Sequence, residues 1–270
     1  GEQAPGVSLT PDEKVEIAEA LEAADIDVIE AGSACTSEGE RDCIRRVTDL
    51  DLDATVTSFA RGIKSDIDHA LDCTVDGITL VVPSSDKHIE TKVGSTREAV
   101  IESSVELIEY ATDHDLWVEL LGEDGSRADP EFLVELAEAG HEAGADRYCY
   151  ADTPAAAGAD FVHGTVNGIG ERAGNVAIEE VAIALSHSYG IETLTLPAVY
   201  ELATTVSKHT EVPLAPNKAV IGQNTFTHES GIHTDGTLKD GAMYEPYPPE
   251  TVGRERRLVL GKHAGRAGVE

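Results

Sequence analysis

The chain has 270 residues, enough to bury a full hydrophobic core in one large α/β domain. It carries 51 acidic and 20 basic residues, a formal net charge of −31 at pH 7. This charge argues against nucleic acid as a partner, because the phosphates would be repelled. The sequence contains no run of 18 apolar residues and begins without a basic or apolar leader, so we expect a cytoplasmic protein with no membrane partner.

The acidic residues are spread along the whole chain, and only eight lysines accompany them. Such a surface is typical of proteins that work in concentrated salt, because screening removes the repulsion between like charges. A salt-loving source is therefore one hypothesis. The four cysteines lack CxxC spacing, so we interpret them as thiols without a zinc or disulfide role.

The first predicted element is a helix that begins after Thr10. Thr10, Pro11 and Glu13 supply an N-cap, a proline at the first helical position and a capping-box glutamate. Apolar residues then recur on one helical face as far as Ala24. A second capping box, Ser95-Thr-Arg-Glu98, opens a later helix. The predicted strands span residues 27–33, 54–59, 77–82, 116–121, 147–150 and 161–166.

Strands that alternate with helices predict parallel βαβ units. Because the strands are rich in Val, Ile and Leu and no GxGxxG loop follows the first, we favour a (β/α)8 TIM barrel over a doubly wound open sheet. We expect residues 1–205 to form an incomplete barrel. Residues 206–270 are expected to form its end and the start of a short C-terminal helical subdomain.

Two features indicate that the barrel is incomplete. No strand precedes the first helix, so the first strand is expected to be missing. Only about eight residues separate the strand that ends near Thr153 from the strand at Phe161, although a parallel crossover needs a dozen or more. One later βα unit is therefore also expected to be missing, either as an unordered segment left out of the sequence or as a deletion, and we favour the first explanation.

Polar motifs occur at the carboxyl ends of the strands and beyond the last strand, where such barrels carry their chemistry. Five of them, taken in order, resemble the 2-isopropylmalate, citramalate and homocitrate synthases. These form the acyl-transferring branch of the metal-dependent barrel family that also contains hydroxymethylglutaryl-CoA lyase. The motifs are Gly1-Glu-Gln-Ala-Pro-Gly-Val7, Asn167-Gly-Ile-Gly-Glu-Arg-Ala-Gly-Asn175, Pro216-Asn-Lys-Ala-Val-Ile-Gly222, His228-Glu-Ser-Gly-Ile-His233 and Gly261-Lys-His-Ala-Gly-Arg266.

The resemblance implies an enzyme that condenses acetyl-CoA with a 2-oxoacid, using a divalent metal (Mg, Mn or Zn) to polarise the oxoacid carbonyl. Relatives take metal ligands from an acidic residue just before Gly-Glu-Gln and from a His-x-His on a later strand, and this sequence contains neither. The His-x-His would lie in the gap after Thr153. Asn175 matches the amide ligand on or beside the metal; its alternative interpretation is an N-cap for a helix that begins at Val176.

Other site residues are implied by the same motifs. Glu123 matches the strand-end glutamate that handles protons, and its alternative interpretation is a structural carboxylate bonded to Arg127. Gln3 matches a residue near the metal and the substrate carboxylate, and Thr153 matches the hydroxyl that contacts the same carboxylate.

His233 and Tyr244 match the two residues that follow the barrel in this family and that activate acetyl-CoA and the hydrolytic water. His228 is interpreted as a scaffold or CoA-proximal residue. In relatives these groups act on a neighbouring subunit, so a homodimer is implied.

Two positions bear on the oxoacid. Homocitrate synthases carry an arginine at the position of Glu119, so a dicarboxylic substrate is not expected. Leu121 replaces the small serine common in isopropylmalate synthases, and its bulk would narrow the pocket towards pyruvate. Because the other motifs match best, we expect 2-isopropylmalate synthesis from 2-oxoisovalerate, with (R)-citramalate synthesis from pyruvate as the alternative. A non-catalytic relative that binds an oxoacid or acyl-CoA, or a metal-free lyase, would belong to other functional classes.

Overall fold

The computed structural model describes residues 2–150 and 160–259. The chain divides into two compact units. The first, here called the sheet unit, consists of Thr10–Ala18 and Asp27–Phe161. The second unit consists of Gly1–Leu9, Glu19–Ile26 and Val162–Glu270.

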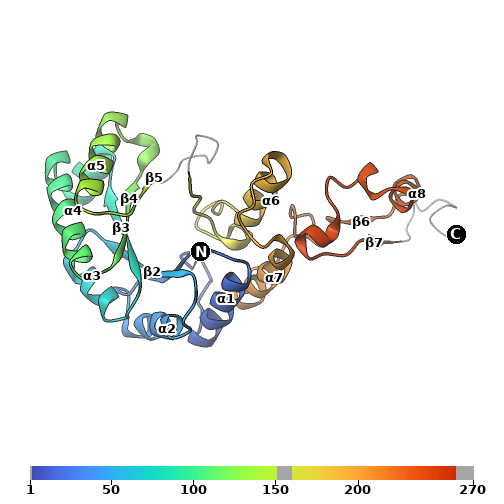
Figure 1. The fold of residues 1–270 in the computed structure, drawn as a ribbon, viewed down its shortest axis with the longest axis horizontal. Coiled ribbons are helices and arrows are strands. Elements are labelled where there is room, and N and C mark those ends of the chain that lie inside the picture. Colours follow the sequence, from blue (N-terminus) through green and yellow to red (C-terminus); the bar gives the residue numbers. More distant parts are fainter. Residues whose placement is uncertain (1, 151–159, 260–270) are drawn as a thin grey trace. The chain divides into compact units, whose positions relative to one another are not determined.

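The sheet unit is built on five parallel strands. Each strand is hydrogen-bonded to the one before it in the sequence, and α-helices connect them along one face of the sheet (Figure 1). This arrangement confirms the predicted barrel-type βαβ units, and five predicted strands lie within two residues of their observed bounds. The elements are β1 (Val28–Gly32), α2 (Glu38–Thr48), β2 (Thr55–Arg61), α3 (Lys64–Leu71), β3 (Gly77–Pro83), the π-helix η1 (His88–Val93), α4 (Arg97–Thr112), β4 (Trp117–Glu123), the 3-10 turn η2 (Gly125–Arg127), α5 (Pro130–Glu142) and β5 (Arg147–Tyr150).

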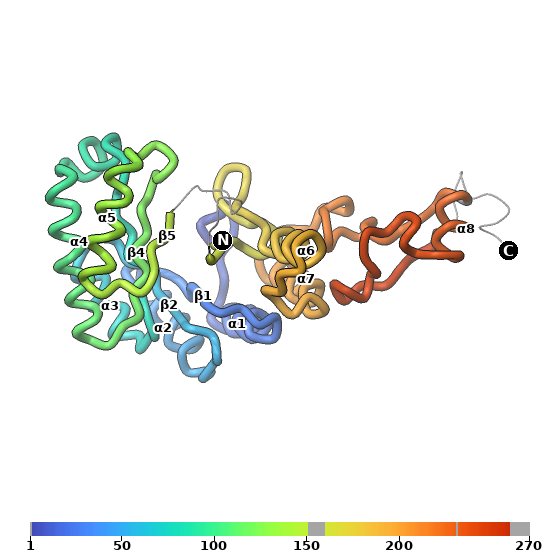
Figure 2. The backbone as a smooth tube through the Cα atoms, turned by 45° about the horizontal axis from the view of Figure 1, so that its top comes forward, coloured from blue at the N-terminus to red at the C-terminus, as the bar shows by residue number. Residues whose placement is uncertain are grey.

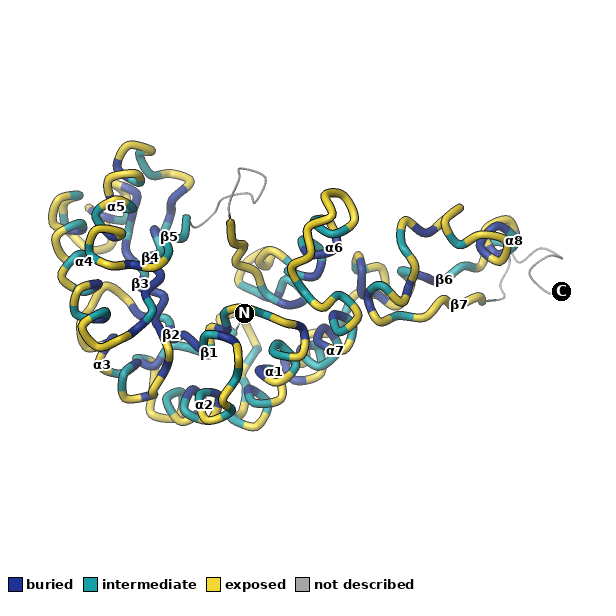
Figure 3. The backbone as a smooth tube through the Cα atoms, viewed as in Figure 1, coloured by how far each residue is buried: buried dark blue, intermediate teal, exposed yellow. Residues whose placement is uncertain are grey.

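The two faces of this sheet differ in chemistry. On the face that the helices cover, Leu80 and Leu120 are fully buried against Ile108 of α4 and Leu136 of α5. Each such side chain contributes about 1.5–3 kcal/mol through its burial. Figure 2 shows the helices of this unit beside its strands, and Figure 3 shows the buried residues concentrated along the strands and most exposed residues on the helices and loops.

The opposite face carries polar residues, because successive side chains of a strand alternate between its faces. Phe59, Thr79, Glu119 and Arg147 lie in register across β2 to β5. Thr79 and Glu119 are nonetheless buried, at 3% and 1% exposure, so polar side chains occupy part of the covered sheet surface. Polar residues concentrated on one face of a parallel sheet suit a site rather than a core.

The helix ends test two sequence predictions. α1 (Pro11–Ala23) has the predicted capping box: the Thr10 amide and hydroxyl donate to the Glu13 carboxylate over 2.7 and 2.8 Å. For α4 the predicted cap is wrong by one residue. Thr96 rather than Ser95 precedes the helix with an extended backbone and accepts the amide of Ala99 at 3.3 Å.

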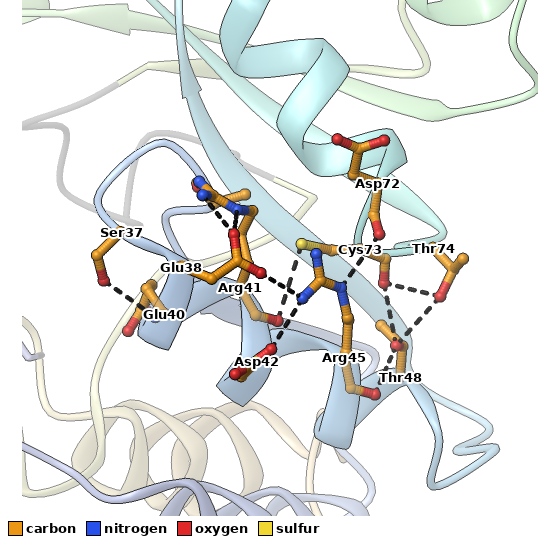
Figure 4. A network of polar contacts seen from close by, with 11 residues as sticks. Ser37, Glu38, Glu40, Arg41, Asp42, Arg45, Thr48, Asp72, Cys73 and Thr74 are labelled. Atoms are coloured by element: carbon orange, nitrogen blue, oxygen red, sulfur yellow. Dashed lines mark hydrogen bonds and ion pairs between the residues drawn. The ribbon is translucent and has the colours of Figure 1, made fainter.

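The outer surface of α2 shows how few cations serve many carboxylates (Figure 4). Glu38 accepts hydrogen bonds from Arg41 at 2.6 Å and from Arg45 at 3.0 Å, and Arg45 also reaches Asp42 at 2.9 Å. Arg45 further donates to the backbone carbonyl of Asp72, just beyond α3. Exposed ion pairs of this kind add little to the stability of a protein, so the network mainly limits repulsion within the acidic surface.

The second unit holds short elements that follow the predicted gap. They are η4 (Val166–Gly168), α6 (Ile178–Tyr189), η5 (Leu196–Ala198), α7 (Val199–Thr210), β6 (Thr227–His228), α8 (Gly231–Lys239), η6 (Gly241–Met243), η7 (Pro249–Val252) and β7 (Arg257–Leu258). The two short strands β6 and β7 pair in parallel. The strand predicted at residues 161–166 is wrong, because only Thr165 makes a bridge, to Ala177. Throughout the described chain, no helix is both long and apolar enough to cross a bilayer.

Candidate functional site

The predicted site residues divide between the two units. Glu123 and Leu121 belong to the sheet unit, whereas Gln3, Asn175, His233 and Tyr244 belong to the second unit. Thr153 and the neighbouring peptide bonds at the predicted gap lie outside the described residues. The gathering of Glu123, Thr153 and Asn175 around one cation therefore stays a prediction.

Glu123 ends β4 and is held by residues of the preceding βα connection. The Lys92 ammonium donates to both of its carboxylate oxygens, over 2.8 and 2.6 Å, and His88 Nδ1 lies 3.4 Å from Oε2. Both bases belong to η1, a single turn of π-helix, a conformation that is rare and frequent at functional sites. The side chain of Glu123 remains 35% exposed. Sequence reasoning missed His88 and Lys92, because nothing in the local pattern marks a π-helical turn.

The alternative ion pair of Glu123 with Arg127 is not formed, since Arg127 bonds the next residue. Arg127 Nε donates to Asp124 over 2.7 Å, Ser85 donates its hydroxyl to the other carboxylate oxygen, and His88 Nε2 lies 3.7 Å away. The Arg127 guanidinium lowers the pKa of Asp124. Asp124 is buried and left-handed at φ 66°, so the two adjacent carboxylates point into different surroundings. Asp124 is enclosed by Arg127 and Ser85, whereas the Glu123 side chain is partly exposed.

Leu121 lies on the same strand and the same sheet face as Glu123. It is in register with Val81 of β3 and Cys149 of β5, and it is half-buried. Two residues earlier on the same strand and face, the buried Glu119 carboxylate lies 3.5 Å from the Arg147 guanidinium. A row from Glu119 through Leu121 to Glu123 therefore leads along this face to the carboxyl end of the sheet.

Asn175 ends the loop that begins at Asn167. The helix after it starts only at Ile178 with Ala177 as its N-cap, so the N-cap interpretation of Asn175 is wrong. Its side chain is exposed and lies against Gly170, where an added Cβ would come within 2.6 Å of the amide oxygen. The Asn175 amide therefore does not cap the helix. It lies so close to residue 170 that only glycine, which has no Cβ, fits there.

An ion cluster around the buried Glu179 joins this loop to the Pro216–Gly222 motif. The Asn167 amide donates to Glu179 at 3.1 Å from a left-handed backbone, and its side chain donates to the Ala203 carbonyl. Lys218 pairs with Glu179 at 3.3 Å and donates to Glu180. Burial by itself lowers the pKa of Lys218, but the carboxylates outweigh it and raise the pKa overall. Lys218 therefore joins the Pro216-Asn-Lys motif to the Asn175 loop.

These residues do not by themselves form a metal site. A divalent cation such as Mg²⁺ or Ca²⁺ requires six or more oxygen ligands, part of them from the protein. Among the described residues Asn175 is the one member of the implied ligand set, and Gln3 is exposed in the N-terminal loop of the second unit. No reaction step is therefore derived through a metal.

His233 and Tyr244 meet, although ten residues separate them in the sequence. Their ring centroids lie 4.4 Å apart at 50°. His233 is exposed on α8, and Tyr244 follows η6. A solvent-facing imidazole against a phenol is able to exchange protons with a bound molecule.

Comparison with known proteins addresses the origin of these motifs. The HMGL-like family model matches residues 1–156 and 153–206, and the homocitrate synthase post-HMGL domain-like model matches residues 220–270. The chain belongs to the HMGL-like family. The resemblance to the 2-isopropylmalate, citramalate and homocitrate synthases is thereby confirmed, as is the TIM-barrel fold class.

Individual HMGL-like relatives are more similar still. A putative (R)-citramalate synthase of Methanothermobacter thermautotrophicus is 46% identical over 306 positions, which cover 98% of this chain and 62% of the relative. The (R)-citramalate synthase of Methanocaldococcus jannaschii is 43% identical over 312 positions, which cover 100% of this chain and 64% of the relative. The chain thus spans less than two thirds of these relatives.

The alignments also bear on the predicted gap. The 312 aligned positions of the Methanocaldococcus relative exceed the 270 residues of this chain, so about 42 positions have no counterpart here. The HMGL-like match breaks into two parts that meet at residues 153–156. Both findings agree with a βα unit missing after Thr153.

Solved structures support the fold. The hydroxymethylglutaryl-CoA lyase of Pseudomonas aeruginosa superposes with a TM-score of 0.66 at 17% identity, covering 77% of this chain and 89% of the lyase. The corresponding lyase of Brucella melitensis has a TM-score of 0.64 at 15% identity, covering 78% and 95%. At this identity the likeness establishes the fold of the HMGL-like chain.

Proposed function

We propose that this chain is the catalytic part of a synthase that condenses acetyl-CoA with pyruvate to give (R)-citramalate. The observation that carries the proposal is the 43–46% identity, across the whole of this chain, to relatives named as (R)-citramalate synthases. The sequence alone favoured 2-isopropylmalate with citramalate as the alternative, and the relatives support the alternative better.

The sheet face opposite the helices, here called the inner face, favours a small oxoacid as the substrate. Leu121 is placed beside Glu123 on that face, where a leucine takes up space that a serine would leave to a branched substrate. The cation of the same row, Arg147, lies near Glu119 and over the rings of Trp117 and Phe161, at 4.9 and 3.6 Å from their centroids. These contacts give Arg147 a structural role in place of pairing with a second substrate carboxylate.

The proposed roles follow from the surroundings of each group. Glu123 holds and transfers a proton at its exposed carboxylate, with Lys92 and His88 fixing its position. His233 and Tyr244 act together on the thioester and on the water that releases CoA. Gln3 contributes a polar contact near the oxoacid carboxylate, and Asn175 keeps its predicted place on or beside the divalent metal. The same proposal includes a homodimer, in which His233 and Tyr244 of one subunit act beside Glu123 of its neighbour. It also includes a barrel that ends near residue 205.

The test is release of CoA, followed as free thiol, from acetyl-CoA in the presence of Mg²⁺ or Mn²⁺. Pyruvate, 2-oxoisovalerate and 2-oxoglutarate are compared in parallel, and we expect pyruvate to be used fastest. Glu123→Gln should lower the rate by at least about 100-fold, in line with loss of a general acid–base group. Glu138→Gln, the same change at an exposed position of α5, serves as the control.

Each outcome is informative. Faster turnover of 2-oxoisovalerate would restore the 2-isopropylmalate assignment. Thiol release that is equal in the Glu123→Gln variant would remove Glu123 from the mechanism. No release with any oxoacid would contradict the synthase proposal and favour a binding protein.

A further inference from the structure

An ion cluster around the buried Glu245 carboxylate adjoins the His233–Tyr244 ring pair, because Glu245 directly follows Tyr244 in the chain. Glu245, the residue after Tyr244, accepts Arg256 Nε at 2.9 Å on one oxygen and Arg256 Nη2 at 2.5 Å on the other. His228 Nε2 lies 3.0 Å from the first oxygen. The Glu245 side chain is only 3% exposed, and the Arg256 guanidinium lowers its pKa.

The cluster joins three elements of the second unit. His228 belongs to β6, Arg256 directly precedes β7, and Glu245 follows η6. The strands are paired, and the Glu245 amide donates to the Gly241 carbonyl at 3.0 Å. A buried carboxylate that loses its partners incurs a large desolvation penalty, so this side chain cannot shift independently of Arg256 and His228. The backbone next to Tyr244 is thereby anchored.

Two glycines make room for this arrangement. A Cβ at Gly241 would lie 2.5 Å from Arg256 Nη2, inside the ion pair. A Cβ at Gly236, in α8, would lie 2.5 Å from Cε2 of the Tyr244 ring. A side chain at Gly236 would displace the phenol ring, so this contact depends on glycine, whereas at Gly241 the end of the flexible Arg256 side chain would have to move aside.

We infer that the cluster of His228, Glu245 and Arg256 positions the His233–Tyr244 pair, and that His228 and Glu245 are positioning residues rather than catalytic ones. In the segment from His228 to His233, His228 anchors the backbone and the His233 ring faces solvent. In the pair Tyr244–Glu245, Glu245 anchors the backbone and the Tyr244 ring is partly exposed. The geometric part stands by itself, and the consequence for turnover rests on the proposed function.

The first test is spectroscopic and needs no activity. In the full chain labelled at His and Tyr side chains, rings 4.4 Å apart should give NOE cross-peaks between His233 and Tyr244. We expect Glu245→Gln to remove them, because the amide cannot accept the full set of charged donors. Glu255→Gln, an exposed carboxylate beside Arg256, is the matched control and should keep them.

Gly236→Ala tests the same coupling without touching any charge. It should abolish the cross-peaks while the signals of the His228 ring, in the ion cluster, stay unchanged. It also guards against misfolding, because alanine favours the helix in which Gly236 lies. Cross-peaks that persist in both variants, or that are missing from the unmodified chain, would overturn the inference.

The second test measures turnover with pyruvate. Glu245→Gln should lower kcat roughly tenfold or more while KM for the oxoacid changes little, as expected when a reacting group is misplaced by about 1 Å. Arg256→Lys keeps the charge and should recover part of kcat. An unchanged kcat in active protein would overturn the positioning role. Loss of the cross-peaks in a chain without any turnover would support the coupling and contradict only the synthase proposal.

Discussion

Leu121 offers the sharpest test of how this chain selects its oxoacid. The substitution Leu121→Ser replaces three carbons by one hydroxyl oxygen, a net loss of two heavy atoms, on the sheet face beside Glu123, between Val81 and Cys149. Pyruvate and 2-oxoisovalerate differ by two carbons next to the carbonyl, so the space opened is sufficient for the larger substrate. We expect the variant to gain activity with 2-oxoisovalerate relative to pyruvate.

The magnitude follows from the size of the change. One methylene in an apolar pocket alters discrimination by about 1–3 kcal/mol. The two substrates differ by two carbons. Because Leu121 is only half-buried, we take the lower limit of about 1 kcal/mol for each of these carbons, about 2 kcal/mol in total. This free energy corresponds to about a 30-fold shift in the ratio of the kcat/KM values for 2-oxoisovalerate and pyruvate. The loss of partly buried apolar area should also cost about 1–2 kcal/mol of stability.

The assay is thiol release with both oxoacids for the unmodified chain, for Leu121→Ser and for Leu133→Ser. Leu133 is also half-buried, but it lies on α5, so its loss should lower stability without changing the ratio. A ratio that moves by less than about threefold in Leu121→Ser would refute the reasoning. A shift of equal size in both variants would attribute it to general loosening.

Three further predictions concern charge. Lys92→Gln should lower turnover at least about tenfold, because the Lys92 ammonium donates to both carboxylate oxygens of Glu123. The stability should change by less than about 1 kcal/mol, because Lys92 is 54% exposed. Lys92→Arg should retain activity, and equal turnover in the Gln variant would exclude a role of Lys92 in holding Glu123. Burial raises the pKa of Asp66, but the hydrogen bonds from Arg61 lower it by a larger amount. The pKa of Asp66 therefore falls below its ordinary value of 3.8. A lowered carboxyl pKa adds stability above the unfolded pKa and loses it as pH falls. Asp66→Asn should therefore cost about 1.5–3 kcal/mol in denaturant titrations at pH 7 and progressively less below pH 3.8, and a pH-independent difference would contradict this. Finally, the charge of −31 predicts a melting temperature about 5–10 °C higher in 2 M KCl than in 10 mM KCl, whereas equal stability would count against adaptation to salt.

The strands show which parts of the fold could be read from the sequence. Five of them were predicted within two residues, because a short run of apolar, β-branched or aromatic residues bounded by turn residues is a local signal. The sixth, at residues 161–166, has the same local signal but makes a single bridge, between Thr165 and Ala177. A strand also requires a neighbour, and the comparisons indicate that the βα unit preceding this segment is missing.

The site shows the same division at the level of side chains. The motifs marked Glu123, Asn175, His233 and Tyr244, because residue type and spacing are properties of the sequence. The contacts of these residues with other elements were not specified by the sequence, apart from the alternative interpretation of Glu123. Arg127 was the sequence-based partner of Glu123, but the π-helical turn η1 brings Lys92 there instead.

The sequence by itself determined the family, the approximate bounds of five strands and the motifs that contain the proposed reactive groups, since each depends on residues close together in the chain. Tertiary structure alone decided which carboxylate is structural, which bases face Glu123, and that Glu245 anchors the backbone beside Tyr244. Burial and ion pairing arise from the packing of distant segments, and no local pattern specifies them.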